Sequence, residues 1–319
     1  MRHIITGGSG FLGQCLAGEL VRRQEAVLVF DLVPGALPLP FVQGDVTNAA
    51  DLARLQLNSD DVVYHLAARQ FAGPVPHRGR DAWFKQVNLT GTQCLVAEME
   101  RRGAGRLVFF STDMTYGLPQ KLPIAPDHPQ NPLGPYGQSK LAAETVMREA
   151  TRRGMRATIF RPRLITGPGR LGILAKLFGL IKAGLPVPMI GPGRNRYQMV
   201  SVQDCARAAI LAVEQGCPPG PFNLGSEMPP TTRELLQAII DHAGSRSILI
   251  PVSAVASKMA LAVLDSIGLT LLFPEQYGIA DADVLLDTSS TRRELQWQPQ
   301  NSDIGEMILA YDAFRASQT

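Results

Sequence analysis

The stretch Thr6-Gly7-Gly8-Ser9-Gly10-Phe11-Leu12-Gly13 decides the fold. It follows a short apolar run and opens a helical pattern that continues to about residue 23. Gly7, Gly10 and Gly13 stand in G-x-x-G-x-x-G spacing: the first permits a tight turn, the second lets backbone approach a pyrophosphate, and the third lets the helix pack on the strand. The start of that helix offers free N–H groups and a positive dipole end. The stretch therefore predicts a strand, a phosphate-binding loop and a helix.

Asp31 strengthens this interpretation, because a Gly-rich turn alone also occurs as a plain connection. It stands 21 residues after Gly10 and closes the next apolar run, Ala26 to Phe30. An acidic residue at that place accepts hydrogen bonds from the adenosine ribose of a dinucleotide. No arginine follows in Leu32 to Gly35 to accompany a 2′-phosphate. The pair favours dinucleotide binding, with NAD preferred over NADP.

Composition points to a small-molecule partner. The chain has 319 residues, 18% of them charged, and a formal net charge of +3, without any run of like charges. Nothing here indicates a nucleic-acid or membrane-surface partner. The four cysteines are scattered, with no C-x-x-C pair, which fits reduced thiols better than a disulfide or zinc framework. We expect no metal and a cytoplasmic location; the cysteines are Cys15, Cys94, Cys205 and Cys217.

Two segments bear on membrane targeting. The N-terminus runs directly into the first strand without an apolar leader. The most apolar late segment, Val252 to Phe273, is broken by Lys258 and Asp265. We expect neither a signal peptide nor a membrane span.

Strand and helix patterns alternate through the first half of the chain. This alternation predicts an α/β fold with a Rossmann-type, doubly wound parallel sheet. The expected strands after Asp31 are Phe41 to Gln43, Asp61 to Ala68, Arg106 to Ser111 and Arg156 to Phe160, and the expected helices are Asp81 to Arg102 and Tyr136 to Arg153.

The composition changes at Gly167 to shorter elements broken by Gly and Pro. Residues 1–166 are therefore expected to form the NAD-binding domain, and residues 167–319 mainly a smaller substrate-binding region. Two later runs, Tyr197 to Ser201 and Phe222 to Leu224, look like returns to the sheet near 197–225. The second domain is expected to be interleaved with the first.

Tyr136 and Lys140 stand at i and i+4, on one face of a helix. A cation about 4 Å away is worth ~4 kcal/mol at an effective dielectric of 20, or roughly three pKa units. Lys140, with a positively charged nicotinamide, would thus lower the pKa of the Tyr136 phenol, ordinarily near ~10, toward a range useful for a base. By itself the spacing is better explained by a helix start with an ordinary exposed pair.

Ser111-Thr112 favours a catalytic role for Tyr136 and Lys140 over an ordinary exposed pair, because it lies at the carboxyl end of an expected strand. Open α/β sheets bind their ligands at this edge. A hydroxyl group there can hold a substrate oxygen while Tyr136 takes or gives the proton. The alternative is a Ser/Thr pair that satisfies local backbone.

These pieces resemble an extended short-chain dehydrogenase/reductase of the NAD-dependent epimerase/dehydratase kind, over nearly the whole length. The matching segments, in order, are Thr6 to Gly13, Asp31, Gly44-Asp45-Val46, His65 to Ala68, Asn88 with Gly91-Thr92, Ser111-Thr112 with Tyr116-Gly117, Tyr136 to Lys140, Arg161-Pro162 with Gly167-Pro168, and Phe222 to Gly225.

The resemblance implies roles for individual residues. Thr112, Tyr136 and Lys140 are the implied catalytic set, with Lys140 also holding the nicotinamide ribose. Asp45 and Val46 are implied to meet the adenine of NAD, and Leu66, Ala67 and Ala68 to run along the cofactor. Asp45 could also simply start a turn, and any buried strand would be apolar at 66–68. The expected cofactor contacts also include Phe11 and Leu12 of the loop.

Two departures from the family pattern concern the substrate. In dehydratases of nucleotide sugars an Asp-Glu pair follows the hydroxyl residue, whereas Asp113 here is followed by Met114. Many sugar-nucleotide epimerases have Asn at the position of Leu164. Arg163, Arg194 and Arg196 are candidate clamps for a substrate diphosphate, or else solvated loop arginines. Ser111, Asp113, Arg163 and Arg196 are the expected substrate residues.

The expected function is NAD-dependent 4-epimerisation of a nucleotide sugar through a transient keto intermediate. The alternative is a dehydrogenase or reductase of a secondary alcohol or ketone, and the apolar segment Ala254 to Phe273 suits an apolar substrate of that kind. A cofactor-sensing protein without turnover ranks last, since Tyr136 and Lys140 are both present. Apolar residues on more than one face of the helices Asp81 to Arg102 and Tyr136 to Arg153 predict a homodimer.

Overall fold

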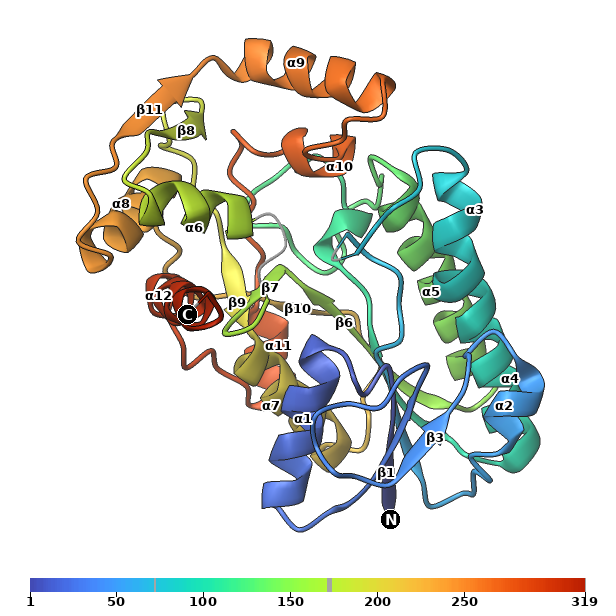
Figure 1. Ribbon diagram of the computed structural model, residues 1–319. Coiled ribbons are helices and arrows are strands. Elements are labelled where there is room, and N and C mark those ends of the chain that lie inside the picture. Colours follow the sequence, from blue (N-terminus) through green and yellow to red (C-terminus); the bar gives the residue numbers. More distant parts are fainter. Residues whose placement is uncertain (72, 171–173, 319) are drawn as a thin grey trace.

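A parallel sheet of seven strands forms the centre of the protein (Figure 1). The computed structural model describes residues 1–71, 73–170 and 174–318. The strand order is β10-β6-β5-β4-β1-β2-β3, and every neighbouring pair is parallel. The predicted doubly wound sheet is confirmed. Its strands are β1 (Arg2–Thr6), β2 (Ala26–Asp31), β3 (Phe41–Gln43), β4 (Val62–His65), β5 (Arg106–Phe110), β6 (Arg156–Pro162) and β10 (Phe222–Leu224).

Helices cover both faces of the sheet (Figure 1). On one face lie α1 (Phe11–Arg22), α7 (Val202–Glu214) and α11 (Ser289–Leu295). On the other lie α2 (Ala49–Ala53), α4 (Thr92–Arg102) and α5 (Pro135–Arg152). Both faces of the middle strands are therefore buried, which explains why β4 and β5 read as almost continuous apolar runs.

The helix predicted over Asp81 to Arg102 is present but interrupted. It begins as α3 (Arg80–Lys85), passes through one π-helical segment at Gln86–Gly91, and continues as α4. Such π-bulges occur inside α-helices, frequently near functional sites. Within this segment, Asn88 donates from Nδ2 to the Ser139 hydroxyl of α5 at 2.9 Å.

A second lobe contains most of the chain after residue 174 (Figure 1). Its apolar core lies between α6 (Leu174–Lys182), α8 (Thr232–His242) and α12 (Asp303–Ala316), beside a small sheet of β8 (Val187–Ile190) and β11 (Leu249–Val252). After β11 the chain forms α9 (Ala254–Ser266) and α10 (Pro274–Tyr277).

One of the two predicted returns to the main sheet is confirmed and the other is wrong. Phe222–Leu224 forms β10 and pairs with β6. Met199–Ser201 forms β9, but it pairs with β7 (Leu164–Thr166) in a separate two-stranded sheet. β10 occupies the edge of the main sheet next to β6. β9 therefore pairs with β7, the strand that follows β6 in the chain. The division at residues 166 and 167 stays a prediction.

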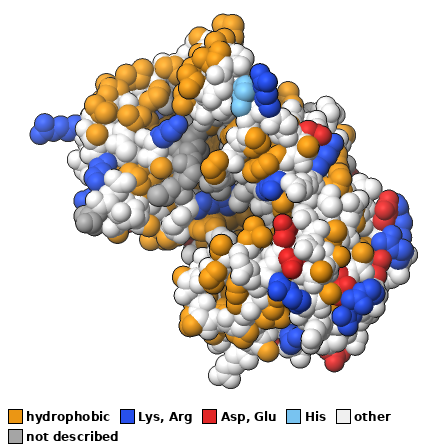
Figure 2. Space-filling view, turned by 45° about the vertical axis from the view of Figure 1, so that its right-hand side comes forward, with side chains coloured by type: hydrophobic (Ala, Val, Ile, Leu, Met, Phe, Trp, Pro, Cys, Tyr) orange, Lys and Arg blue, Asp and Glu red, His pale blue; other side chains and the backbone are white. Residues whose placement is uncertain are grey.

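Apolar side chains are exposed along α9, at the top of the molecule in Figure 2. Val255, Met259 and Val263 are each more than 60% exposed, and Ile267 just after the helix is 64% exposed. Throughout the part of the chain that the structure describes, no helix is both long and apolar enough to cross a bilayer.

Candidate active site

The glycine-rich loop between β1 and α1 is closely packed against its surroundings. Gly7 has a φ of +72°, and a Cβ on it would stand 2.5 Å from the Ala67 nitrogen. A Cβ on Gly13 would stand 2.4 Å from the Gly7 carbonyl oxygen. No side chain caps α1 at Gly10, so the first-turn N–H groups around Phe11 and Leu12 are left for a ligand. This cradle fits the diphosphate of a dinucleotide.

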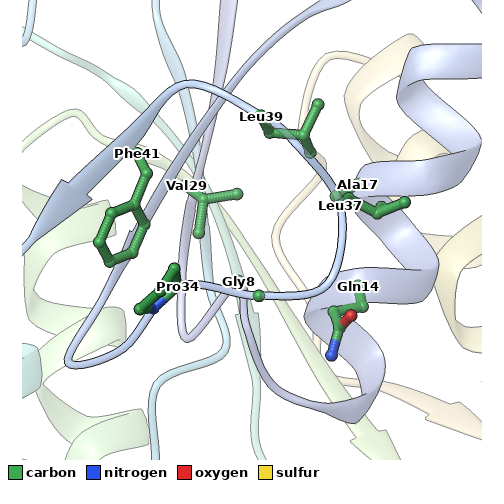
Figure 3. A pocket seen from close by; sticks show the side chains of 9 residues that line it. Gly8, Gln14, Ala17, Val29, Pro34, Leu37, Leu39 and Phe41 are labelled. Atoms are coloured by element: carbon green, nitrogen blue, oxygen red, sulfur yellow. The ribbon is translucent and has the colours of Figure 1, made fainter.

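Asp31 lies beside this loop, as predicted. Its carboxylate accepts hydrogen bonds from the backbone nitrogens of Ser9 at 3.0 Å and Leu32 at 2.7 Å. The following loop closes a pocket over α1, and Figure 3 shows Val29, Leu37 and Phe41 around it. No Lys or Arg is among the described residues that line this pocket. The Asp31 carboxylate would meet a 2′-phosphate with a like charge, which is consistent with NAD.

The other expected cofactor residues follow β3 and β4. Asp45 accepts from the nitrogen and the hydroxyl of Thr47, each at 2.8 Å, so it does form a local turn. Val46 is buried, and its Cγ2 would stand 2.7 Å from a Cβ on Gly91. Leu66, Ala67 and Ala68 continue directly from β4 at the carboxyl edge of the sheet, with Ala67 against Gly7. They lie along the same edge as Asp31.

Thr112, Tyr136 and Lys140 are brought together at the adjoining part of this edge. Thr112 follows β5, while Tyr136 and Lys140 lie in the first two turns of α5. The Thr112 hydroxyl faces the Tyr136 phenol and lowers its pKa. The Lys140 Nζ lies 4.3 Å from the centre of the Phe109 ring. All three side chains are less than 10% exposed.

The electrostatics of this set differ from the expectation for Tyr136. Burial raises the pKa of the phenol to about 12, Asp113 and Glu275 add to that effect, and Arg170 opposes it. Burial also lowers the pKa of Lys140 to about 7. The opposing positive charge on the Tyr136 phenol comes from Arg170, while the Lys140 ammonium lies over the Phe109 ring. The protein groups alone keep the phenol protonated at neutral pH.

Ser111 belongs to a buried ion network rather than to the Tyr136 group. Its hydroxyl donates to Glu144 at 2.6 Å. Arg161 donates to both oxygens of Glu144, at 2.9 and 2.7 Å, and Arg148 adds a bond at 2.6 Å. These bonds lower the pKa of Glu144 despite its burial. The network fixes the carboxyl end of β5 against α5 and β6.

The candidate anion clamps are in two different environments. Arg163 donates to Asp113 at 2.8 Å, and both side chains are buried. Its guanidinium also stacks over the Tyr197 ring at 4.5 Å. Arg163 is thus already paired, next to Thr112. Arg194 and Arg196 are exposed, and the structure does not join them to the Tyr136 group.

Residues that sequence reasoning missed surround Tyr136. The rings of Phe71 and Phe84 lie 5.3 and 5.6 Å from the Tyr136 ring. Arg170 lies with its Cζ 5.6 Å from the centre of the Phe11 ring, and it donates to Gln70 at 2.8 Å. Arg170 directly follows the Gly167-Pro168-Gly169 segment, a position that could have drawn attention; the phenylalanines carry no such signal.

Comparison with known proteins decides the family. The model of the NAD-dependent epimerase/dehydratase family matches residues 3–225. The chain belongs to this family. Like other members of the epimerase/dehydratase family, it uses NAD as its cofactor, and the glycine cradle and Asp31 fit that cofactor.

Individual relatives span from about three quarters to nearly all of the chain. The uncharacterized protein y4nG of Sinorhizobium fredii is 34% identical, covering 99% of this chain and 79% of its own. The UDP-glucose 4-epimerase of Streptococcus mutans is 27% identical, covering 99% and 97%. The 2-alkyl-3-oxoalkanoate reductase of Stenotrophomonas maltophilia is 28% identical, covering 77% and 76%.

A solved structure also shares the fold. The Thermus thermophilus UDP-glucose 4-epimerase in complex with NAD is similar with a TM-score of 0.78 and 25% identity, covering 99% of this chain and 100% of that one.

Proposed function

We propose that the protein is an NAD-dependent 4-epimerase of a nucleotide sugar. The observation that carries the proposal is the convergence of Thr112, Tyr136 and Lys140 at the carboxyl edge of the sheet. It occurs in a chain that aligns along 99% of its length with a UDP-glucose 4-epimerase. The cofactor, when bound, supplies the acceptor and the donor of a hydride.

The protein groups have distinct tasks in this proposal. Tyr136, as phenolate, takes the proton of a sugar hydroxyl group. The sugar carbon that carries this hydroxyl group loses a hydride at the same time. Thr112 donates a hydrogen bond to the same oxygen, and Lys140 binds the nicotinamide ribose. In the reverse step Tyr136 returns the proton to the carbonyl oxygen, as the hydride returns to the opposite face. The sugar ends as its epimer, with no net oxidation.

Ionising Tyr136 is the demanding part of this reaction. The pKa of the phenol is raised to about 12 by burial, so the phenolate requires positive charge nearby. Arg170 already acts in that direction. The positive nicotinamide of oxidised NAD would add to it, which couples proton removal to the presence of oxidised cofactor.

Two features define the substrate in this proposal. Met114 stands where dehydratases carry the second acid of an Asp-Glu pair, so the site lacks that elimination machinery. Arg194 and Arg196 are exposed cations in the second lobe and can bind a diphosphate. Arg163 is already bound to Asp113 and is the weaker candidate.

A dehydrogenase or reductase of a secondary alcohol or ketone is the second candidate. Three observations favour it: Leu164 replaces the polar residue expected for a diphosphate, Arg163 is paired, and Phe71 and Phe84 make the surroundings of Tyr136 apolar. A relative that is a 2-alkyl-3-oxoalkanoate reductase agrees with it. A non-catalytic NAD sensor ranks third, because Tyr136 and Lys140 are both in place. The four free thiols keep the cytoplasm as the proposed location.

Ligand binding separates the first two candidates. Thermal unfolding is measured with NAD present and UDP, UDP-glucose or a medium-chain 3-oxo acid added. A ligand that binds only the native state raises the melting temperature. The epimerase proposal predicts that UDP and UDP-glucose do so and the oxo acid does not. The reverse pattern would replace it with the reductase.

A further inference from the structure

Glu275 of α10 reaches the first turn of α5, the helix that carries Tyr136 and Lys140. Its Oε1 accepts from the Tyr136 nitrogen at 3.1 Å, and its Oε2 accepts from the Gly137 nitrogen at 3.2 Å. The Glu275 residue is only 5% exposed. These are two of the N–H groups that a helix start leaves without intrahelical partners. A residue 138 positions away from Gly137 thus caps this helix.

The residue at the N-cap position cannot do this itself. Gly134 precedes Pro135 and has no side chain, and no side-chain bond caps α5 from that position. A Cβ on Gly134 would stand 2.4 Å from the Glu275 carboxylate. The missing side chain therefore makes room for Glu275, and the carboxylate supplies the charge favoured at a helix N-terminus.

The segment that carries Glu275 is fixed to the first domain beside Tyr136. Arg80 at the start of α3 binds both oxygens of Asp265 in α9, at 2.9 and 2.6 Å. The Arg80 guanidinium also lies over the Phe273 ring at 5.1 Å. Phe273 lies 4.6 Å from the Phe71 ring, which in turn contacts Tyr136. The ion pair and the rings hold Glu275 against α5.

We propose that Glu275 is a positioning residue for Tyr136: its carboxylate fixes the first turn of α5, and so the place of the phenol, from the C-terminal segment. The proposal rests on the role of Tyr136 in the proposed function, and it does not depend on which alcohol or sugar reacts. A residue of the second lobe thereby becomes part of the catalytic geometry.

Glu275 also acts on the phenol through its charge. The groups that face Tyr136 are Thr112, Asp113, Arg170 and Glu275, with Lys140 one turn further along α5. The negative charges of Asp113 and Glu275 raise the pKa of the phenol, whereas Arg170 and Thr112 lower it. Removal of the Glu275 charge should therefore let the phenol ionise at lower pH.

Glu275→Gln tests both effects without any substrate. In the NAD-saturated protein, hydrogen exchange of the peptide that contains residues 134–140 reports the two capped N–H groups. A ¹³C NMR titration of tyrosine-labelled protein, with the Tyr136 signal assigned from Tyr136→Phe, reports the phenol. We expect faster exchange at the start of α5 and a Tyr136 titration shifted to lower pH.

Asp265→Asn is the matched control, because it loosens the same segment without touching α5. It should lower the melting temperature but leave the Tyr136 titration as in the native protein. The proposal is overturned if Glu275→Gln leaves both readouts native, or if Asp265→Asn reproduces both changes. In the latter case Glu275 would only dock the segment.

A rescue variant keeps the test usable if Glu275→Gln is poorly folded. Glu275→Ala makes room for a Cβ at position 134, and Gly134→Ser then places a hydroxyl that can accept from Gly137. The double variant should regain slow exchange at the start of α5, while Tyr136 still titrates at lower pH than in the native protein. Absence of both results would overturn the proposal. Because no readout uses turnover, a failed search for a nucleotide-sugar substrate leaves this test intact.

Discussion

Arg163 and Asp113 form a buried ion pair, with 2.8 Å between the guanidinium nitrogen and the carboxylate oxygen, directly beside Thr112. Burial raises the pKa of Asp113, and the Arg163 charge opposes that shift. The pair thus engages one nitrogen of an expected substrate cation, while the Nε and Nη2 of Arg163 are buried without a hydrogen-bond partner among the described residues. It also places a negative charge next to Tyr136.

Asp113→Asn should destabilise the protein strongly. It leaves the Arg163 guanidinium buried without its counter-charge, and breaking a buried pair in this way costs about 3–5 kcal/mol. Urea unfolding measures the effect. Glu227→Gln is the matched control, since Glu227 pairs with Arg292 at the surface and both side chains are nearly half exposed. An exposed pair contributes about 0–1 kcal/mol. Equal losses in the two variants would contradict the structural role of the Asp113 pair.

Tyr136→Phe should leave NAD affinity unchanged but lower turnover by roughly 10²–10⁴-fold, because only the proton path is removed. The change should appear in kcat rather than in substrate binding. NAD titration and steady-state kinetics measure the two quantities. Tyr311→Phe, in the core of the second lobe, is a control that should keep native turnover. Near-native turnover of Tyr136→Phe would remove Tyr136 from the proposed role.

Glu306→Gln should change how stability depends on pH. Burial raises the pKa of Glu306 to about 7, with Asp204 adding to the shift, and Oε2 has no hydrogen-bond partner among the described residues. The folded protein therefore holds this proton more tightly than the unfolded chain, and its stability falls as the pH rises from about 4.5 to 7.

The Glu306→Gln variant does not lose stability over this pH range, because its side chain carries no titrating proton. It should be more stable than the native protein at pH 8, by about 1–3 kcal/mol, and equal to it near pH 4. Denaturant unfolding at the two pH values measures the difference. The same difference at both values would show that Glu306 does not titrate in this window.

The predicted homodimer stays a prediction, with a narrower basis than the sequence indicated. Leu95, Val96, Met99 and Met147 lie in the core of the single chain. Half-buried apolar side chains on the α3-to-α4 helix and on α5 include Trp83, Val87, Leu89, Leu141, Ala142 and Val146, of which Val87 and Val146 also pack against the core. We expect light scattering at micromolar concentration to give the mass of two chains for the native protein. The Val146→Glu variant should give the mass of a single chain. A monomer mass for the native protein would contradict the prediction.

The parts that could be predicted from sequence depend on local spacing. One βαβ unit defines both the loop at Gly7 to Gly13 and Asp31, which ends the second strand of that unit. One helix defines the i, i+4 pair of Tyr136 and Lys140. Their positions follow once strands and helices alternate.

The parts that could not be predicted depend on contacts between distant segments. Glu275 reaches Gly137 across 138 positions, and Phe71 meets Tyr136 from another loop. The pairing of Arg163 with Asp113 and of β9 with β7 likewise depends on tertiary packing, which no periodicity records. The raised pKa of Tyr136 has the same origin, since spacing shows Lys140 nearby but not how deeply the phenol is buried.

The most direct test of the central proposal follows the sugar and the cofactor in one reaction. The NAD-loaded protein is incubated with UDP-glucose or UDP-galactose, the products are separated by chromatography, and NADH is followed by its absorbance. The account predicts that either sugar reaches the same equilibrium mixture of the two epimers, with no accumulation of NADH. NADH that builds up in proportion to product, or no epimer with any nucleotide sugar, would contradict it.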